Sequence, residues 1–108
     1  MNRQTLSLLS LCQRAGKMKT GEDTVEKAIQ KKEAKLVIIP EDASDNTKKK
    51  FTNKCKHYDV PILITSTKDI LSSIIGKDNR STFAIIDENF ANKIHSMLEQ
   101  QVVVRGCP

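Results

Sequence analysis

Three short runs of aliphatic residues alternate with longer helical patterns, and this alternation constrains the fold more than any other feature of the chain. The runs are LVII at 36–39, VPILIT at 60–65 and TFAII at 82–86. Short apolar runs rich in Ile and Val, bounded by proline or polar residues, are typical of buried strands. Strands that alternate with helices favour a largely parallel sheet with helices on both faces. We therefore expect an α/β fold, a three-layer α/β/α sandwich.

Apolar residues recur at helical spacing in the segments between these runs. In the first segment the i, i+3, i+4, i+7 pattern is followed by Leu8, Leu11, Cys12 and Ala15, and Gly16 ends the predicted helix. The same spacing predicts four further helices, at about 20–32, 44–58, 66–75 and 87–98.

Capping residues mark several helix ends. Ser66 and Asp69 fit a capping box, Gly76 ends the same short helix, and Asp87 caps the last one. The final segment, QVVVRGCP, fits either a frayed end or a fourth strand. We therefore predict one domain over residues 1–99, followed by a C-terminal tail at 100–108.

Length and charge limit the classes of function. A chain of 108 residues is long enough for one self-sufficient core. Its formal net charge of +5 points to a polyanion or an acidic surface as partner, without choosing between them. With one Tyr, three Phe and no Trp, recognition by stacking of bases on an aromatic platform is disfavoured.

The cysteines Cys12, Cys55 and Cys107 lie far apart, with no CxxC pair and no Cys/His ligand spacing. This pattern disfavours a structural zinc site. The N-terminal segment is too polar for a signal peptide, and the apolar runs are far too short to span a bilayer. We expect a cytoplasmic protein with reduced thiols, no metal, no cofactor and no membrane association.

Candidate catalytic groups are few. His57 and His95 lie in helical segments with no Ser or Cys nucleophile placed beside them, and no nucleophile elbow, P-loop or HExxH motif occurs. Glu41 and Asp42 follow a strand, where α/β folds hold catalytic groups. They also precede a helix start at Ser44, where acids stabilise the helix dipole. We favour the dipole role and predict that the protein is not an enzyme.

Lysines supply most of the excess positive charge, in KKEAK at 31–35 and KKKFTNKCK at 48–56. Lys50 and Lys54 share one face of the predicted helix, and Phe51 lies on the opposite face. Two interpretations remain open for this helix: a solvated lysine face, or a row that contacts phosphates.

The segment TGEDTVEKAI at 20–29 also allows two interpretations. Thr20 and Asp23 fit the capping-box pattern, which the pattern alone favours. The alternative is a binding corner, because a helix amino terminus offers N–H groups and Gly21 lets a ligand approach closely. Polar side chains just after the glycine can then reach base edges in an opened major groove. The polar and charged residues around this corner are Lys17, Lys19, Glu22, Asp23, Thr24 and Lys27.

The order of motifs resembles one known family. AGKMKTGEDTVEKAI, AKLVIIPEDAS and VPILITSTKDI, followed by a short helix ended by glycine, resemble the L-seven-Ae family of ribosomal proteins, whose members bind RNA kink-turns. LCQRAGK, EDASDNTKKKF and NKC are most similar to its small bacterial YlxQ-like branch. The likeness runs from Leu6 to Phe90. It implies an α/β/α sandwich with a small four-stranded mixed sheet.

The resemblance implies a non-catalytic, RNA-binding protein that stabilises the bent form of a kink-turn, in ribosomal RNA or an mRNA element. By position, Gly21 would permit close approach, Lys27 would contact the tandem G·A pairs and Lys68 would contact the RNA backbone. The loop at 77–80 would pack on the bulged nucleotides, with Arg80 as its best contact. We expect a monomer.

Two residues depart from the pattern of the family. Its archaeal and eukaryotic members usually have Asn-Glu where this chain has Asp23 and Thr24. An ionised Asp only accepts hydrogen bonds, and Thr carries one short hydroxyl. These departures favour the alternative function, a protein-interaction module on the same fold with weak or no RNA binding.

Overall fold

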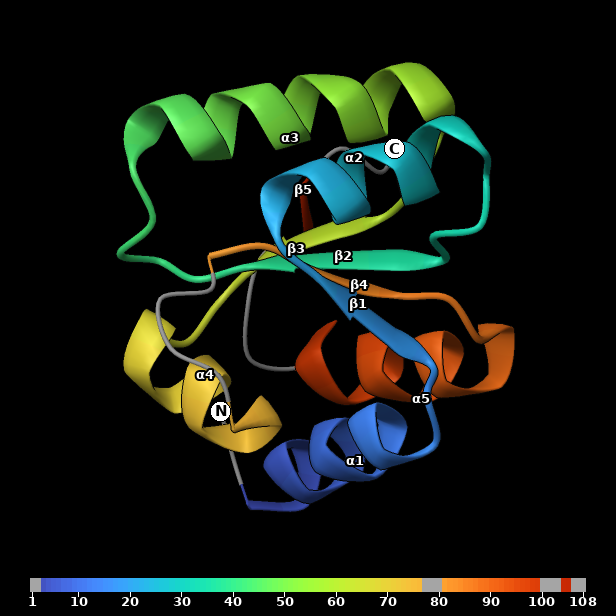
Figure 1. The fold of residues 1–108 in the computed structure, drawn as a ribbon, viewed down its shortest axis with the longest axis vertical. Coiled ribbons are helices and arrows are strands. Elements are labelled where there is room, and N and C mark those ends of the chain that lie inside the picture. The colour runs from blue at the N-terminus through green and yellow to red at the C-terminus, as the bar shows by residue number, and fades with distance from the viewer. Residues whose placement is uncertain (1–2, 77–80, 100–103, 106–108) are drawn as a thin grey trace.

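The computed structural model describes residues 3–76, 81–99 and 104–105, and these form three layers (Figure 1). The helices are α1 (Arg3–Arg14), α2 (Glu22–Gln30), α3 (Asp45–Tyr58), α4 (Lys68–Ile75) and α5 (Glu88–Glu99). The strands are β1 (Met18–Thr20), β2 (Leu36–Ile39), β3 (Ile62–Ile64), β4 (Phe83–Ile85) and β5 (Val104–Arg105). Helices α2 and α3 cover one face of the sheet, and α1, α4 and α5 cover the other. The expected α/β/α sandwich is confirmed.

The sheet is mixed, with its strands in the order β1-β4-β2-β3-β5. Strands β2 and β3 are parallel, whereas the β1–β4, β2–β4 and β3–β5 ladders are antiparallel. The expectation of a largely parallel sheet is therefore wrong. Strand β4 begins at the end of the sheet where β2 ends, because Phe83 pairs with Ile38. A strand that is buried on both faces has the same apolar pattern in either direction, so the sequence does not reveal this reversal.

The sequence pattern did not predict strand β1. Its residues, Met18, Lys19 and Thr20, are each half-buried, and the strand lies at the edge of the sheet beside β4. A strand of three residues with one apolar side chain shows no detectable alternation of apolar and polar residues. At the other edge, Val104–Arg105 pairs with β3 as strand β5, so this part of the predicted tail belongs to the sheet.

Strand β2 joins the two halves of the core. Each of its four residues is fully buried. Leu36 and Ile38 pack in the cluster beneath α1, α4 and α5, while Val37 and Ile39 pack in the cluster beneath α2 and α3. Alternate side chains of a strand point to opposite faces, so this one strand supplies both cores.

Two of the helix starts, those of α3 and α5, have the predicted capping residues. The Ser44 hydroxyl accepts a hydrogen bond from the Thr47 N–H (3.1 Å), and Asp87 Oδ1 accepts one from the Phe90 N–H (3.0 Å). Helix α4 is capped by Thr67, whose hydroxyl accepts from the Ile70 N–H (3.2 Å), and the predicted capping box at Ser66 is wrong. Ser66 instead has a left-handed backbone (φ 66°), which turns the chain off β3 one residue before the cap.

Two of the cysteines are buried, unpaired thiols, as expected. Burial raises the pKa of Cys12 to about 11 and that of Cys55 to about 12, so both are neutral and act as small apolar side chains. Among the described residues, no three His, Cys, Asp or Glu side chains come together as metal ligands would. None of the described helices combines the length and apolarity that a membrane span requires.

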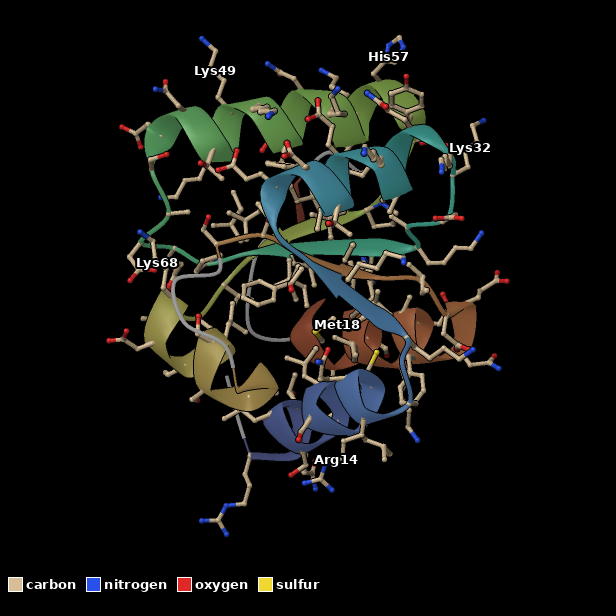
Figure 2. All side chains as sticks on the ribbon, in the orientation of Figure 1. Arg14, Met18, Lys32, Lys49, His57 and Lys68 are labelled. Atoms are coloured by element: carbon tan, nitrogen blue, oxygen red, sulfur yellow. The ribbon has the colours of Figure 1, made fainter. Side chains whose placement is uncertain are left out.

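Phe51 provides a test of how α3 is held to the sheet. Its side chain is fully buried in the α2–α3 core, so Phe51→Ala should lower the free energy of unfolding by about 3–5 kcal/mol. Lys49→Ala, on the exposed face of α3 (Figure 2), should change it by less than about 0.5 kcal/mol. Urea unfolding followed by circular dichroism measures both, and similar losses in the two variants would contradict this packing.

Candidate functional site

One end of the sheet gathers the ends of several strands. Thr20, the last residue of β1, pairs with Phe83, the first residue of β4. Phe83 also pairs with Ile38 in β2, and Ile39 pairs with Ile64, the last residue of β3. The segments that follow β1, β2 and β3 and that precede β4 therefore meet here, on the left of Figure 1. We call this the α2 end of the sheet, formed by Gly21, Pro40, Glu41, Asp42, Ser66, Thr67, Lys68 and Thr82.

Hydrogen bonds connect these segments to one another. The Gly21 N–H donates to the Thr82 carbonyl (3.2 Å), and the Glu41 N–H donates to the Ser66 carbonyl (2.9 Å). The Lys68 N–H donates to Asp42 Oδ1 (2.9 Å), so this acid stabilises the start of α4. Asp42 thus has the helix-start role that we favoured over catalysis, although it acts on α4 rather than on α3.

Helix α2 begins at Gly21 without a side-chain cap. Its backbone (φ 96°, ψ 144°) lies in a region that only glycine adopts without strain. The predicted capping box is wrong, because Thr20 belongs to β1 and is held in the ladder opposite Phe83. The positive end of the helix dipole therefore has no hydroxyl or carboxylate from its N-cap residue to offset it.

The exposed face of α2 carries the residues that the sequence placed at the corner. Asp23, Thr24 and Lys27 are all exposed, and the buried face of the helix consists of Val25, Ala28 and Ile29. Asp23 and Lys27 are four residues apart, so they share the outward face.

Glu22 and Glu26 face α3 and pair with its lysines. Lys50 Nζ lies 3.7 Å from Glu22 Oε1 and 3.4 Å from Glu26 Oε1, and Lys54 Nζ lies 2.7 Å from Glu26 Oε2. The hydrogen bond from Lys54 is the main cause that lowers the pKa of Glu26. The charges of Lys50 and Lys54 are therefore paired within the protein, which argues against a row of free lysines that contacts phosphates.

The predicted site residues are only partly brought together. Lys68 lies at the α2 end, at the start of α4 (Figure 2), with its side chain half-exposed. Lys19 lies within β1 opposite Ala84, a residue of the α2–α3 core, and is half-buried. Lys17 lies at the far end of β1, where its carbonyl accepts from the Ile86 N–H. At about 3.3 Å per residue it is roughly 13 Å along the strand from Gly21. Arg80 and its loop lie outside the described residues.

Two hydroxyl groups at this end were not predicted. Ser66 is 9% exposed and Thr82 is fully buried, and the side-chain oxygen of each has no hydrogen-bond partner among the described residues. Their only signal in the sequence is position, since Ser66 comes two residues after β3 and Thr82 comes directly before β4. They place two hydroxyl groups without a described partner at the α2 end of the sheet.

The amino-acid sequence of the chain is similar to those of known proteins. The model of the ribosomal protein L7Ae/L30e/S12e/Gadd45 family matches residues 3–95. The chain is similar to an RNA-binding protein YlxQ from Bacillus subtilis (strain 168), with 47% identity over 92 residues that cover 85% of this chain and 92% of the relative. A protein of the same name from Enterococcus faecium is 39% identical over 99 residues, covering 91% of this chain and 95% of that protein.

A solved structure shares the fold. It is that of a protein with unknown function from Bacillus halodurans C, which superposes with a TM-score of 0.87 at 36% sequence identity. The match covers 91% of this chain and 99% of that chain.

The backbone at Gly21 can be tested with one substitution made at two glycines. Gly21→Asn should lower the free energy of unfolding by about 1–3 kcal/mol, because a φ of 96° with a ψ of 144° is strained for any residue that has a side chain. Gly76→Asn should cost clearly less, since Gly76 is in the left-handed helical region that Asn tolerates and a Cβ there meets open space. Thermal unfolding of both variants gives the comparison, and equal losses would contradict the assignment.

The Glu26–Lys54 pair gives a pH-dependent contribution. Because the folded protein lowers the pKa of Glu26, the stabilisation is present above the ordinary Glu pKa and is lost as the pH falls through the lowered value. A double-mutant cycle with Glu26→Gln and Lys54→Met at neutral pH should give a coupling of about 0.2–1 kcal/mol. The coupling should shrink in 1 M salt, because the Debye screening length is then about 3 Å and charges near the surface are screened. A coupling that persists at acidic pH would contradict the ion pair.

Proposed function

The chain belongs to the ribosomal protein L7Ae/L30e/S12e/Gadd45 family, and from this premise we propose that it is a non-catalytic protein that binds kink-turn-like structured RNA and stabilises its bent form. One observation carries the proposal. The start of α2 has a glycine in place of a capping side chain, is exposed, and lies at the same end of the sheet as Lys68. The relatives that are named RNA-binding proteins support it.

In this proposal, the corner at Gly21 approaches the RNA most closely. A glycine lets the backbone reach a nucleic-acid surface, and the open amino terminus of α2 attracts a phosphate or a base acceptor. Asp23 and Thr24 project from the first turn, where Asp23 accepts from amino groups on base edges. Lys27, one turn further on, adds a donor and a positive charge, and Lys68 contacts the backbone from the neighbouring helix.

The ion pairs between α2 and α3 make this corner suitable for a polyanion. Two glutamates in the first two turns of α2 would repel phosphates. Lys50 and Lys54 offset their charge from the side of α3, at 2.7–3.7 Å. The outward lysine, Lys27, is then available to the RNA instead of to Glu22 or Glu26. Charge compensation on one side of the helix thus supports RNA binding on the other.

The proposed effect on the RNA is a shift in population. A kink-turn exchanges between extended and sharply bent forms, and a protein that contacts only the bent geometry stabilises that form. No covalent step is required. We propose a cytoplasmic monomer that acts on ribosomal RNA or an mRNA element, with the loop at 77–80 and Arg80 near the bulged nucleotides.

A gel-shift series with Lys27→Ala tests the site. The probes are a consensus kink-turn and a straight duplex of equal length in which Watson–Crick pairs replace the G·A pairs. The wild-type protein should retard the kink-turn preferentially, with a log–log salt slope of about −0.9 per neutralised phosphate. Lys27→Ala should make the slope less steep by about one unit, because one phosphate contact is lost. Lys49→Ala removes the same charge from the exposed face of α3 and should leave the slope unchanged.

The outcomes separate the alternatives. Equal affinity for the straight duplex and the kink-turn would contradict kink-turn recognition and would indicate general RNA binding. Absence of a retarded band at low salt, in a protein that is folded by circular dichroism, would favour the protein-interaction module, for which Asp23 and Thr24 argue.

A further inference from the structure

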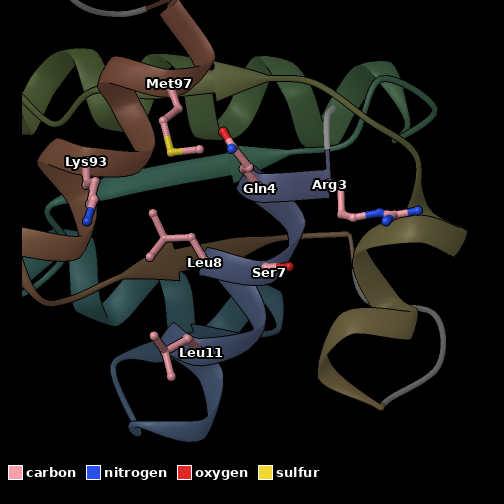
Figure 3. Close-up of a pocket in the computed structure, with 7 residues that line it drawn as sticks. All are labelled: Arg3, Gln4, Ser7, Leu8, Leu11, Lys93 and Met97. Carbon is pink, nitrogen blue, oxygen red and sulfur yellow. The ribbon is translucent and has the colours of Figure 1, made fainter.

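A groove lies between α1 and α5, in the layer on the opposite face of the sheet from α2. It has a volume of about 590 Å³ (Figure 3). Its seven lining residues are Arg3, Gln4, Ser7, Leu8, Leu11, Lys93 and Met97. Leu8 and Leu11 come from α1 and Met97 from α5, so both helices contribute apolar side chains. The proposed RNA site uses none of these residues.

The apolar side chains of this groove are only partly covered by the protein, since Leu8 packs against the core and is half-buried whereas Leu11 is exposed. Leu9 and Cys12 of α1 face the sheet and are at most 1% exposed. Leu11, on the same helix, is 53% exposed and is one of two large apolar residues in the described chain with such exposure. A partner that buries this exposed leucine and the adjoining apolar groove would stabilise the complex by removing apolar surface from water.

The charges around the groove have one sign. Arg3 and Lys93 lie on opposite sides of the Leu8–Leu11 row in Figure 3, and none of the seven described residues that line the groove is acidic. Helix α1 carries two charged residues, Arg3 and Arg14, and both are positive. A partner for this groove must therefore supply apolar side chains at its centre and carboxylates at its edges.

From these observations we propose that the α1–α5 groove binds an acidic amphipathic helix of a partner protein. The occupant would place apolar residues at i, i+3 or i+4 and i+7 on the Leu8, Leu11 and Met97 side chains, and Asp or Glu beside Arg3 and Lys93. Helix α1 has 12 residues and is roughly 18 Å long, which matches about three turns of such a helix.

Two other occupants fit the groove less well. A second copy of this chain would bring its own Arg3 and Lys93 to the same surface, and the like charges would oppose a symmetric contact. RNA would place phosphates over an apolar floor, whereas phosphate binding uses clustered cations and N–H groups. The groove and the α2 end belong to different parts of the molecule, so an RNA and a helix can bind together.

The test uses a synthetic peptide of about 18 residues, roughly five turns, labelled with fluorescein. Leu occupies its i, i+3, i+4 and i+7 positions, and Glu and Ala occupy the others. A control peptide has Lys in place of every Glu. Fluorescence anisotropy should show binding of the Glu peptide and much weaker binding of the Lys peptide. Amide chemical shifts should move at Leu8, Leu11 and Met97.

Matched variants locate the binding surface. Leu11→Glu should weaken binding of the Glu peptide at least about tenfold, because it removes buried apolar area and adds a like charge. Ile70→Glu alters the other exposed large apolar residue, which is 42% exposed on α4, and should leave peptide binding unchanged. Reversal of both charges, Arg3→Glu with Lys93→Glu, should transfer the preference to the Lys peptide.

Several outcomes would overturn the proposal. These are no binding of the Glu peptide at about 1 mM, equal effects of Leu11→Glu and Ile70→Glu, or equal affinity for the two peptides. Sedimentation that shows a wild-type dimer dissociated by Leu11→Glu would instead assign the groove to a second copy. Gel shifts with kink-turn RNA are a separate measurement, and Leu11→Glu should leave them unchanged.

Discussion

The pairing of Phe83 with both Thr20 and Ile38 determines where the candidate site lies. This one residue places the start of β4 between the end of β1 and the end of β2. Thr20 is then fixed in the sheet, so the chain can leave the strand only at Gly21, whose N–H is bound to the neighbouring Thr82 carbonyl. Helix α2 therefore begins at the end of the sheet with a glycine at its amino terminus. Gly21 adopts a φ of 96° because the chain turns sharply from β1 into α2 at this residue.

The distribution of charge follows from the packing of α2 against α3. A lysine-rich helix suggests a polyanion surface, yet Lys50 and Lys54 are paired with Glu22 and Glu26. The paired lysines hold two helices together on one side and neutralise acids near the start of α2. Lys27, the lysine proposed to contact a ligand from α2, has no ion pair with these glutamates and lies on the less basic of the two helices.

The two proposed surfaces differ in chemistry as well as in position. The α2 end of the sheet offers backbone N–H groups, short polar side chains and lysines, which suit a folded nucleic acid. The α1–α5 groove offers Leu8, Leu11 and Met97 with flanking cations, which suit an acidic helix. Since the two surfaces share no residue and Gly21 and α2 lie across the sheet from the α1–α5 groove, one molecule could hold an RNA and a partner protein at the same time. That combination would suit a factor that brings components of a ribonucleoprotein together.

The amino-acid sequence alone predicts the layers, three of the strands in outline, all five helices and the apolar run of β2, because periodicity and apolar runs are local properties. It also located the Gly21 corner and the exposed Asp23, Thr24 and Lys27. The folded structure is needed to establish the direction of β4, the short strand β1, the partners of Lys50 and Lys54 and the distance of Lys17 from the corner. The physical reason is that strand pairing and ion pairing join residues far apart in the chain, and the side chains that meet carry no local mark of their partners.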